Sequence, residues 1–240
     1  MENKKLTVIL PCAGEGSRLS IATPKELFPI TKGKALIDFT FELFNGCSRS
    51  QVEFAITITD KKLSLVNYLK KYSDQFDLKF IYFNNEFSEF HGSIKSAEPI
   101  IGGKNLILLP DSKIKPRNND FYNDIMTSFD KQNQFFVAKK SNDHGFLRSK
   151  GCLHINANNV VEKYSDKPNS TTEYNGVWAG VAFSREKFEE SLNVLESSTI
   201  HTEGYQQIFS SSGFNSSKVV LVDEYQDLGT WEDIEKFYCS

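Results

Sequence analysis

Two cations follow a glycine-containing turn near the start of the chain. An apolar, β-branched run at residues 7–10 leads into AGEGS at residues 13–17, and Arg18 and Lys25 come soon after. Glycines can take positive φ and carry no Cβ, so the backbone N–H groups of such a turn can close around an anion. The spacing fits neither the G-x-G-x-x-G of dinucleotide folds nor a P-loop. Turn and cations together favour a phosphate-binding loop over an ordinary β-turn.

Two carboxylates follow other apolar runs. Asp111 comes just past the run at residues 105–109, and Asp227 follows the run at residues 219–222 by a few residues. Open α/β sheets bind ligands outside the carboxyl ends of their strands, so we expect both aspartates near the glycine turn. Either alone could be a turn or a helix cap. Together, beside a polyphosphate, they suit Mg²⁺, which commonly takes only one or two oxygen ligands from protein.

Alternating strands and helices must position these residues. Apolar runs rich in β-branched residues predict strands, and stretches with apolar residues at helical spacing predict helices. The alternation in the first half predicts a doubly wound, mostly parallel, Rossmann-like α/β sheet. The expected strands are residues 7–10, 53–59, 78–83 and 105–109, and the expected helices are residues 35–44, 60–72 and 92–101.

The regular alternation of predicted strands and helices ends beyond Asp111. Two short strand-like runs flank Asn158 and Asn159, which predicts a hairpin-like antiparallel excursion over the sheet. The sheet is therefore expected to be mixed. The expected strands in this half are residues 135–139, 151–156, 160–164, 174–184 and 219–222, and the expected helices are residues 121–131, 185–196 and 230–238.

Composition restricts the class of protein. With 240 residues we expect one domain, residues 1–240. A net charge of −3 gives no global basic field, so nucleic acid is not the expected partner and a small ligand is. The apolar run between residues 1–5 and Pro11 is too short for a signal peptide, and no run is long enough to span a membrane, so we expect a cytoplasmic protein. The four widely spaced cysteines suggest neither a zinc site nor a disulfide framework.

The order of several motifs resembles the sugar-1-phosphate nucleotidyltransferases, the pyrophosphorylases that make nucleotide sugars. LPCAGEGSRL with TPKELFPI resembles their signature, HGSIKSAEPII their nucleotide-binding glycine segment, and ILLPDS their first metal aspartate. SDKP resembles their sugar-phosphate motif, VWAGVAF the strand after it, and DLGTWEDI their second metal aspartate. The resemblance implies the nucleotidyltransferase type-A-like fold, with residues 1–112 mainly binding nucleotide and residues 113–240 mainly binding the sugar phosphate.

The resemblance also implies roles for individual residues. The nucleotide-binding residues would be Pro11, Ala13, Gly14, Glu15, Gly16, Ser17, Gly92 and Ser93. Arg18, Lys25 and Asp111 would be catalytic, and Asp111 and Asp227 would bind Mg²⁺ as the cofactor. The sugar phosphate would be held by Gly151, Asp166, Lys167 and Gly180. The family usually reads the base with a Gln before the glycine segment, whereas this chain has Asn85, Glu86 and Phe87 there.

The reaction implied by the resemblance joins an NTP to a sugar 1-phosphate and releases pyrophosphate. UTP or dTTP with glucose 1-phosphate is the first expectation. A cytidylyltransferase acting on a different phosphorylated acceptor and a non-catalytic nucleotide-sugar-binding regulator are the alternatives. A nicotinamide-dependent oxidoreductase is disfavoured, because the acid at the spacing that a ribose contact needs, Asp38, falls inside a predicted helix. The base, the acceptor and a homo-oligomer stay open.

Overall fold

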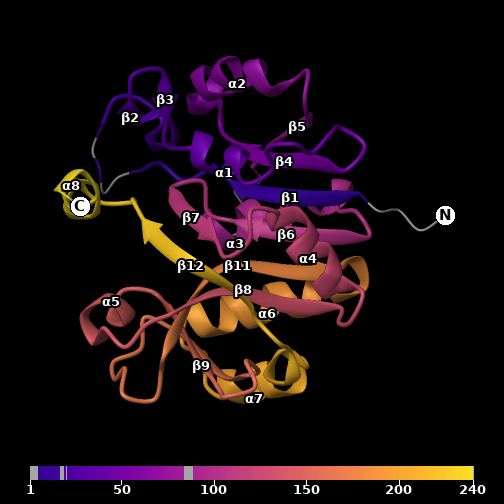
Figure 1. Cartoon of the computed structure of the whole chain (residues 1–240), viewed down its shortest axis with the longest axis vertical. Coiled ribbons are helices and arrows are strands. Elements are labelled where there is room, and N and C mark those ends of the chain that lie inside the picture. Colours follow the sequence, from indigo (N-terminus) through magenta and orange to yellow (C-terminus); the bar gives the residue numbers. More distant parts are fainter. Residues whose placement is uncertain (1–4, 17–18, 20, 84–88, 240) are drawn as a thin grey trace.

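A mixed sheet of ten strands runs through the molecule, in a computed structural model that describes residues 5–16, 19, 21–83 and 89–239 (Figure 1). Its strands are β1 (Leu6–Pro11), β4 (Val52–Ile58), β5 (Asp77–Tyr82), β6 (Lys104–Leu108), β7 (Ser112–Pro116), β8 (Gln134–Lys140), β9 (Gly151–Ile155), β10 (Val161–Asp166), β11 (Gly176–Ser184) and β12 (Val220–Asp227). A separate two-stranded hairpin consists of β2 (Pro29–Thr31) and β3 (Lys34–Ala35).

The sheet is parallel in its first half and mixed in its second. Eight strands are hydrogen-bonded in the order β5-β4-β1-β6-β11-β8-β12-β7, and the antiparallel hairpin β9–β10 extends from β11. β5, β4, β1 and β6 are parallel to one another, whereas β11 runs antiparallel to both β6 and β8. The predicted mixed α/β sheet with an antiparallel excursion is confirmed.

Helices cover both faces of this sheet. They are α1 (Asp38–Glu42), α2 (Leu63–Leu69), α3 (Glu89–Lys95), α4 (Phe121–Phe129), α5 (His144–Arg148), α6 (Phe188–Thr199), α7 (Tyr205–Ser211) and α8 (Trp231–Cys239). Single 3₁₀ turns are η1 (Lys25–Leu27), η2 (Asp60–Lys62), η3 (Lys70–Tyr72), η4 (Glu98–Ile100), η5 (Arg185–Lys187) and η6 (Phe214–Ser216). In the described part of the chain, none of the helices combines the length and apolarity needed to cross a membrane.

The alternation of side chains along β1 divides the core into two layers. Val8 and Leu10 face the layer that α1, α2 and α4 cover, and Ile9 faces the layer that α3, α6 and α7 cover. A slip of one residue would exchange the two faces, so burial on both sides fixes the register of β1. Each fully buried side chain of this size contributes roughly 1.5–3 kcal/mol. The loop after Pro11 therefore leaves the sheet at a defined point.

A third, smaller cluster joins the two ends of the chain. Leu19 and Ile30 pack with Leu228 and Ile234, and the indole Nε1 of Trp231 donates a hydrogen bond of 2.9 Å to the carbonyl of Leu19. Figure 1 shows α8 beside the β2–β3 hairpin, far in sequence but close in space. The segment after the glycine turn is thus held against the segment that follows β12.

Several predicted elements have different bounds; the helix predicted at residues 92–101, for example, is α3 at Glu89–Lys95 followed by η4. The helix predicted at residues 35–44 begins only at Asp38, because the carboxylate of Asp38 accepts a hydrogen bond of 2.8 Å from the backbone N–H of Ala35, which belongs to β3. The strand predicted at residues 219–222 continues to Asp227, where it pairs with β7, a strand that the sequence did not predict. α5, α7 and the β2–β3 hairpin were not predicted either.

Candidate active site

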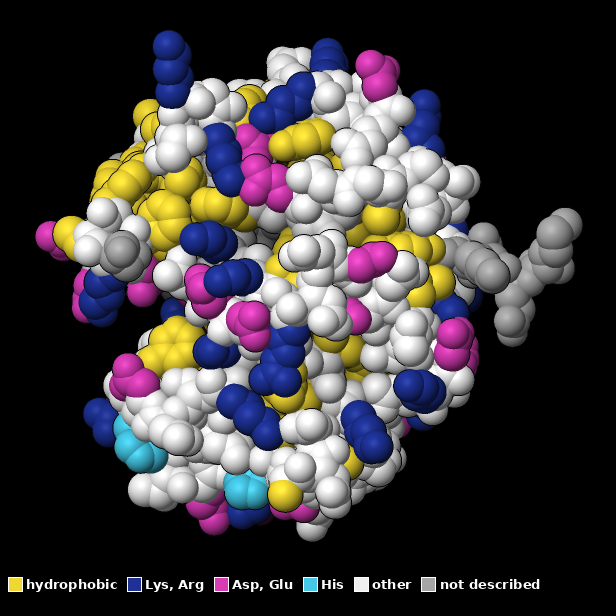
Figure 2. All heavy atoms as spheres, viewed as in Figure 1, with side chains coloured by type: hydrophobic (Ala, Val, Ile, Leu, Met, Phe, Trp, Pro, Cys, Tyr) yellow, Lys and Arg dark blue, Asp and Glu magenta, His cyan; other side chains and the backbone are white. Residues whose placement is uncertain are grey.

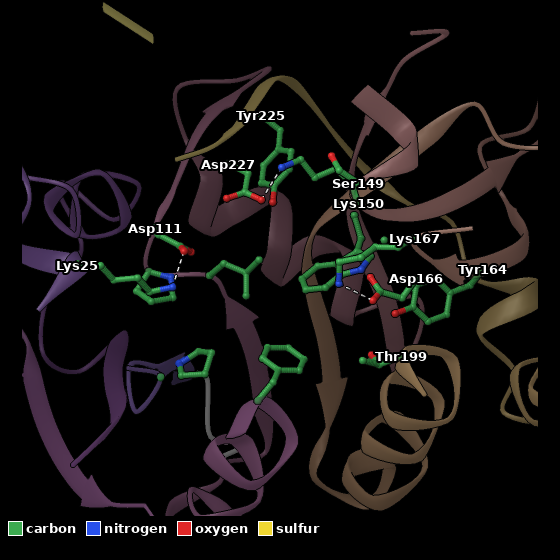
Figure 3. A pocket seen from close by; sticks show the side chains of 17 residues that line it. Lys25, Asp111, Ser149, Lys150, Tyr164, Asp166, Lys167, Thr199, Tyr225 and Asp227 are labelled. Atoms are coloured by element: carbon green, nitrogen blue, oxygen red, sulfur yellow. Dashed lines mark hydrogen bonds and ion pairs between the residues drawn. The ribbon is translucent and has the colours of Figure 1, made fainter. Parts of the chain in front are cut away.

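A cavity of about 290 Å³ opens at the carboxyl ends of the central strands (Figure 3). Its lining residues are Pro11, Gly14, Lys25, Phe90, Leu109, Pro110, Asp111, Ser149, Lys150, Gly151, Tyr164, Asp166, Lys167, Trp178, Thr199, Tyr225 and Asp227. Figure 3 shows Lys25 and Asp111 on one side, Asp166 and Lys167 on the other, and Asp227 with Tyr225 between them. Residues predicted from motifs more than 200 positions apart therefore share one cavity.

The pairing of β7 with β12 brings the two aspartates together. Asp227 lies opposite Ser112 in the antiparallel register, and Ser112 is the residue directly after Asp111. The backbone N–H of Leu228 donates to the carbonyl of Asp111 at 2.8 Å, which extends the ladder to the aspartates themselves. Asp111 is buried and Asp227 is half-buried. Asp111, directly before β7, and Asp227, at the end of β12, thus both line the cavity.

Each of these aspartates is paired with its own lysine. Nζ of Lys25 lies 2.6 Å from Oδ2 of Asp111, and Nζ of Lys150 lies 2.5 Å from Oδ2 of Asp227. The four side chains are between 6% and 17% exposed, so these pairs are shielded from solvent far more than ordinary surface pairs. Interactions between charges are stronger where water is partly excluded. The cavity holds concentrated charge of both signs.

A buried ion pair supports the turn that carries Lys25. Glu26 accepts hydrogen bonds from Nζ of Lys62 at 2.8 and 3.0 Å, and both side chains are at most 5% exposed. Burial raises the pKa of the Glu26 carboxyl, and the neighbouring Lys62 charge opposes that rise. The backbone carbonyl of Glu26 also accepts from the N–H of Ile37 at 3.0 Å. The ion pair and the backbone hydrogen bond of Glu26 therefore hold η1 in place, while Lys25 lines the cavity.

The glycine turn bends around Lys25. Gly16 has φ of 69°, a left-handed conformation that favours glycine, and a Cβ there would lie 3.3 Å from Cβ of Lys25. Gly14 lines the cavity. Ser17 and Arg18, predicted to bind phosphate, lie outside the described residues, as do Asn85, Glu86 and Phe87.

The opposite wall carries the predicted acceptor motif. Asp166 ends β10, and Lys167 follows it with φ of 44° and an Nζ that lies 2.9 Å from Oδ2 of Asp166. Gly151, at the start of β9, lies against the indole of Trp178, and a Cβ at this position would overlap its Nε1. Because the indole fills that space, only glycine fits here without displacing the wall.

Several predicted site residues do not line this cavity. Ala13 is buried, Glu15 is exposed and pairs with Lys61 at 2.7 Å, and Gly16 supports Lys25 from the side. Gly92 and Ser93 lie in α3, where the Ser93 hydroxyl hydrogen-bonds the Thr57 hydroxyl.

Gly180, predicted for the sugar-phosphate pocket, has a packing role instead. It lies within β11 beside β6, where a Cβ would come 2.8 Å from Cδ2 of Leu108 and 3.1 Å from the carbonyl of Ile107. A residue without a side chain is needed for this close approach of two strands. The glycine therefore belongs to the core of the sheet and not to the lining of the cavity.

The sequence did not single out Lys150 or the aromatic residues of the cavity. Phe90, Tyr164, Trp178 and Tyr225 line it together with the charged groups. Lys150 stands between Ser149 and Gly151 in RSKG, a string that reads as an exposed loop. Its only signal was its position directly before the glycine assigned to the sugar-phosphate pocket.

Thiol chemistry does not fit this site. Burial raises the pKa of Cys12 well above its ordinary value and that of Cys152 to about 12. A thiol is nucleophilic as the thiolate, so both groups are inert near neutral pH. The four cysteines are all free.

The donors present fit a hard divalent cation. Two adjacent carboxylates offer oxygen ligands, and no group of three or more His, Cys, Asp or Glu suited to a metal occurs among the described residues. Mg²⁺ commonly takes only one or two carboxylates from protein and completes its shell with phosphate oxygens and water. The pair Asp111 and Asp227 matches that requirement and not that of a structural metal cage.

A second cavity of about 720 Å³ adjoins the first, between α5 and α8. Ser149, Lys150, Tyr225 and Asp227 line both cavities, so the Lys150–Asp227 pair stands between them. Figure 2 shows a hollow at the left edge of the molecule, between the positions of α8 and α5. Lysine and acidic side chains are interspersed on this face, without a large patch of one sign.

A comparison with family models matches residues 6–239 to the nucleotidyl transferase model. No curated protein was found to match the chain in sequence.

Solved structures similar to the chain share its fold at low sequence identity. UTP-bound UGPase from Acinetobacter baumannii is 14% identical, with a TM-score of 0.73 over 98% of this chain and 92% of that one. A UDP-glucose pyrophosphorylase complexed with UDP-glucose is 17% identical, with a TM-score of 0.72 over 100% and 99%. A protein named provisionally as a glucose-1-phosphate thymidylyltransferase, from Bacillus anthracis, is 15% identical, with a TM-score of 0.73 over 96% and 93%.

The buried pair behind Lys25 gives the first prediction. Glu26→Gln leaves the Lys62 ammonium buried without its counter-charge, so we expect a loss of about 3–5 kcal/mol in the free energy of unfolding. The double variant Glu26→Leu/Lys62→Met removes both charges and should recover most of that loss. Urea unfolding followed by circular dichroism measures both. A single variant as stable as the wild type would show that the pair does not hold η1.

Proposed function

The chain belongs to the nucleotidyl transferase family, and we propose that it joins an NTP to a sugar 1-phosphate, releasing pyrophosphate and forming a nucleotide sugar. The observation that carries the proposal is the cavity in which Lys25, Asp111 and Asp227 face Asp166 and Lys167. A phosphate-binding side and an acceptor side with its own cation are what such a transfer needs.

UTP or dTTP with glucose 1-phosphate is the first choice of substrates. Among the similar structures, one is bound to UTP, one to UDP-glucose, and one is named for thymidylyl transfer. The lysines and aspartates of the cavity act on phosphates and do not discriminate among bases. The proposal assigns residues 1–112 mainly to the nucleotide and residues 113–240 mainly to the acceptor.

The reaction requires positioning and charge neutralisation more than proton transfer. An oxygen of the acceptor phosphate attacks the α-phosphorus of the NTP, and the bond from that phosphorus to the pyrophosphate oxygen breaks. With a second pKa of about 6, the acceptor phosphate is already largely dianionic near neutral pH, so no general base has to remove a proton. What the protein must overcome is the repulsion between two anions.

The charged residues of the cavity have distinct proposed tasks. Lys25 and Arg18 hold the NTP phosphates. Asp111 and Asp227 would hold Mg²⁺, which when bound supplies positive charge to the phosphate oxygens.

On the acceptor side, Lys167 holds the phosphate of the acceptor and Asp166 accepts from a sugar hydroxyl. The side chain of Lys167 is 59% exposed, so its ammonium can turn to a ligand without losing packing, whereas Asp166 is only 13% exposed and fixed.

The second prediction concerns the reaction itself. Pyrophosphate release should be highest with UTP or dTTP and glucose 1-phosphate when the common NTPs and dTTP are screened against a panel of phosphorylated acceptors, in the presence of Mg²⁺. Highest release with CTP and another acceptor would move the assignment to a cytidylyltransferase. Binding of UDP-glucose without pyrophosphate release from any pair would instead identify a nucleotide-sugar-binding regulator.

The third prediction separates the aspartates from the fold. Asp111→Asn and Asp227→Asn nearly preserve shape and remove one charge each, so each should lower turnover by about 100-fold or more while the protein stays folded by circular dichroism. EDTA should abolish wild-type turnover. Asp130→Asn is the matched control, because Asp130 is 74% exposed and pairs with Lys104 at 3.4 Å, outside the cavity. Full activity in EDTA, or in both cavity variants, would remove the metal from the proposal.

A further inference from the structure

Lys150 is a cation of the cavity that the proposed reaction has not yet used. Its Nζ lies 2.5 Å from Oδ2 of Asp227, and its side chain is 10% exposed. This shielded ion pair involves a carboxylate that is assigned to the divalent cation. It differs in this from the exposed ion pairs of the β9–β10 hairpin. Lys163, for example, is 44% exposed and pairs with Glu173 at 3.0 Å outside the cavity.

The ammonium of Lys150 is not needed to orient Asp227. The other carboxylate oxygen of Asp227, Oδ1, accepts the backbone N–H of Gly229 at 3.0 Å. The β7–β12 ladder fixes the backbone at the same point. The carboxylate therefore keeps its place when the lysine leaves, and Oδ2 is the oxygen that becomes available.

The backbone of Lys150 is fixed independently of its side chain. Its N–H donates to the carbonyl of Leu147 at 3.0 Å, and its carbonyl accepts the N–H of Lys167 at 2.9 Å. Release of the ammonium breaks neither bond. The side chain also lines both cavities, so it has space to move on either side of Asp227.

The backbone bond to Lys167 places Lys150 directly beside the acceptor motif. Lys167 is the residue proposed to hold the acceptor phosphate, and its main chain is hydrogen-bonded to that of Lys150. Figure 3 shows both lysines on the same wall of the cavity, with Asp227 next to Lys150. An ammonium released from Asp227 is therefore within the part of the cavity where a second phosphate would lie.

We infer that Lys150 exchanges partners during the reaction: it neutralises Asp227 in the empty site and binds the acceptor phosphate once a divalent cation occupies Asp227. This inference rests on the proposed function. The ammonium and the divalent cation compete for one carboxylate oxygen, because two cations on the same oxygen repel each other. Arrival of the cation then supplies a second positive side chain, beside Lys167, for the dianionic acceptor.

The exchange links the two ligands thermodynamically. If the cation frees Lys150 for the acceptor, the acceptor must strengthen binding of the cation by the same factor. Lys150 is then both a competitor of the cation in the empty site and the source of its cooperation with the acceptor. A residue with a merely structural role would produce neither effect.

The test uses Mn²⁺ as the probe cation, followed by the paramagnetic resonance signal of the free ion, with and without glucose 1-phosphate. Lys150→Met should bind Mn²⁺ about 5-fold or more tightly than the wild type, because the competing ammonium is gone. The same variant should bind glucose 1-phosphate more weakly. Its affinity for glucose 1-phosphate should also increase much less on addition of Mn²⁺ than that of the wild type. Lys150→Gln should behave alike and serves if the Met variant folds poorly.

Two further variants sharpen the comparison. Lys163→Met, on β10 of the same hairpin, should match the wild type in both measurements. Lys167→Met should weaken the binding of glucose 1-phosphate without tightening the binding of Mn²⁺. Unchanged Mn²⁺ affinity in both Lys150 variants would overturn the claim that Lys150 competes with the cation. Tighter Mn²⁺ binding, with the mutual strengthening of Mn²⁺ and glucose 1-phosphate intact, would overturn the claim that Lys150 contacts the acceptor phosphate. Failure of the proposed function appears separately, as the absence of pyrophosphate release from the wild type with every substrate pair.

Discussion

The site depends on the antiparallel pairing of β7 with β12. This pairing sets Asp227 opposite Ser112 and continues through the bond from the N–H of Leu228 to the carbonyl of Asp111. Two carboxylates from distant parts of the sequence thereby become neighbours at the edge of the cavity. The ribbon itself is held by the buried side chains of Ile114 and Tyr225 on one face and by Lys115 opposite Glu224, 3.0 Å apart, on the other. A buried cross-strand pair such as Ile114 with Tyr225 contributes roughly 0.2–1 kcal/mol.

Charge balance follows from that constraint. Two adjacent carboxylates with little exposure to water repel each other, and each is neutralised by a lysine from a different segment, Lys25 from η1 and Lys150 from the position directly before β9. Substrates that carry phosphates and a divalent cation can replace both sets of contacts at once. The charges of the empty site therefore balance. On our proposal, its lysines change partners when the substrates and the divalent cation bind. The buried Glu26–Lys62 pair and the packing of Gly151 against Trp178 keep the surrounding walls fixed.

The sequence alone predicts those parts that bury apolar side chains. β1, β4 and β6 are rich in apolar and β-branched residues, so their existence, their parallel direction and the place of Asp111 after β6 could be predicted. β7 and the second half of β12 could not, because SKIKP and DEYQD are mostly polar strings that pair with each other from distant parts of the sequence. Lys150 was missed for a related reason, since its partner is 77 positions away. Gly180 was assigned to the pocket by motif, whereas its contacts place it in the sheet.

The most direct test of the central claim, transfer at one shared site, is to follow the oxygen atoms. Glucose 1-phosphate, or the acceptor that the screen selects, is prepared with heavy oxygen in its phosphate and converted with the matching NTP, and the products are analysed by phosphorus NMR and mass spectrometry. Attack by the acceptor phosphate on the α-phosphorus predicts that the nucleotide sugar keeps every labelled oxygen, including the bridging one, and that the pyrophosphate carries none. Label in the pyrophosphate, or a nucleotide product without label, would contradict the account.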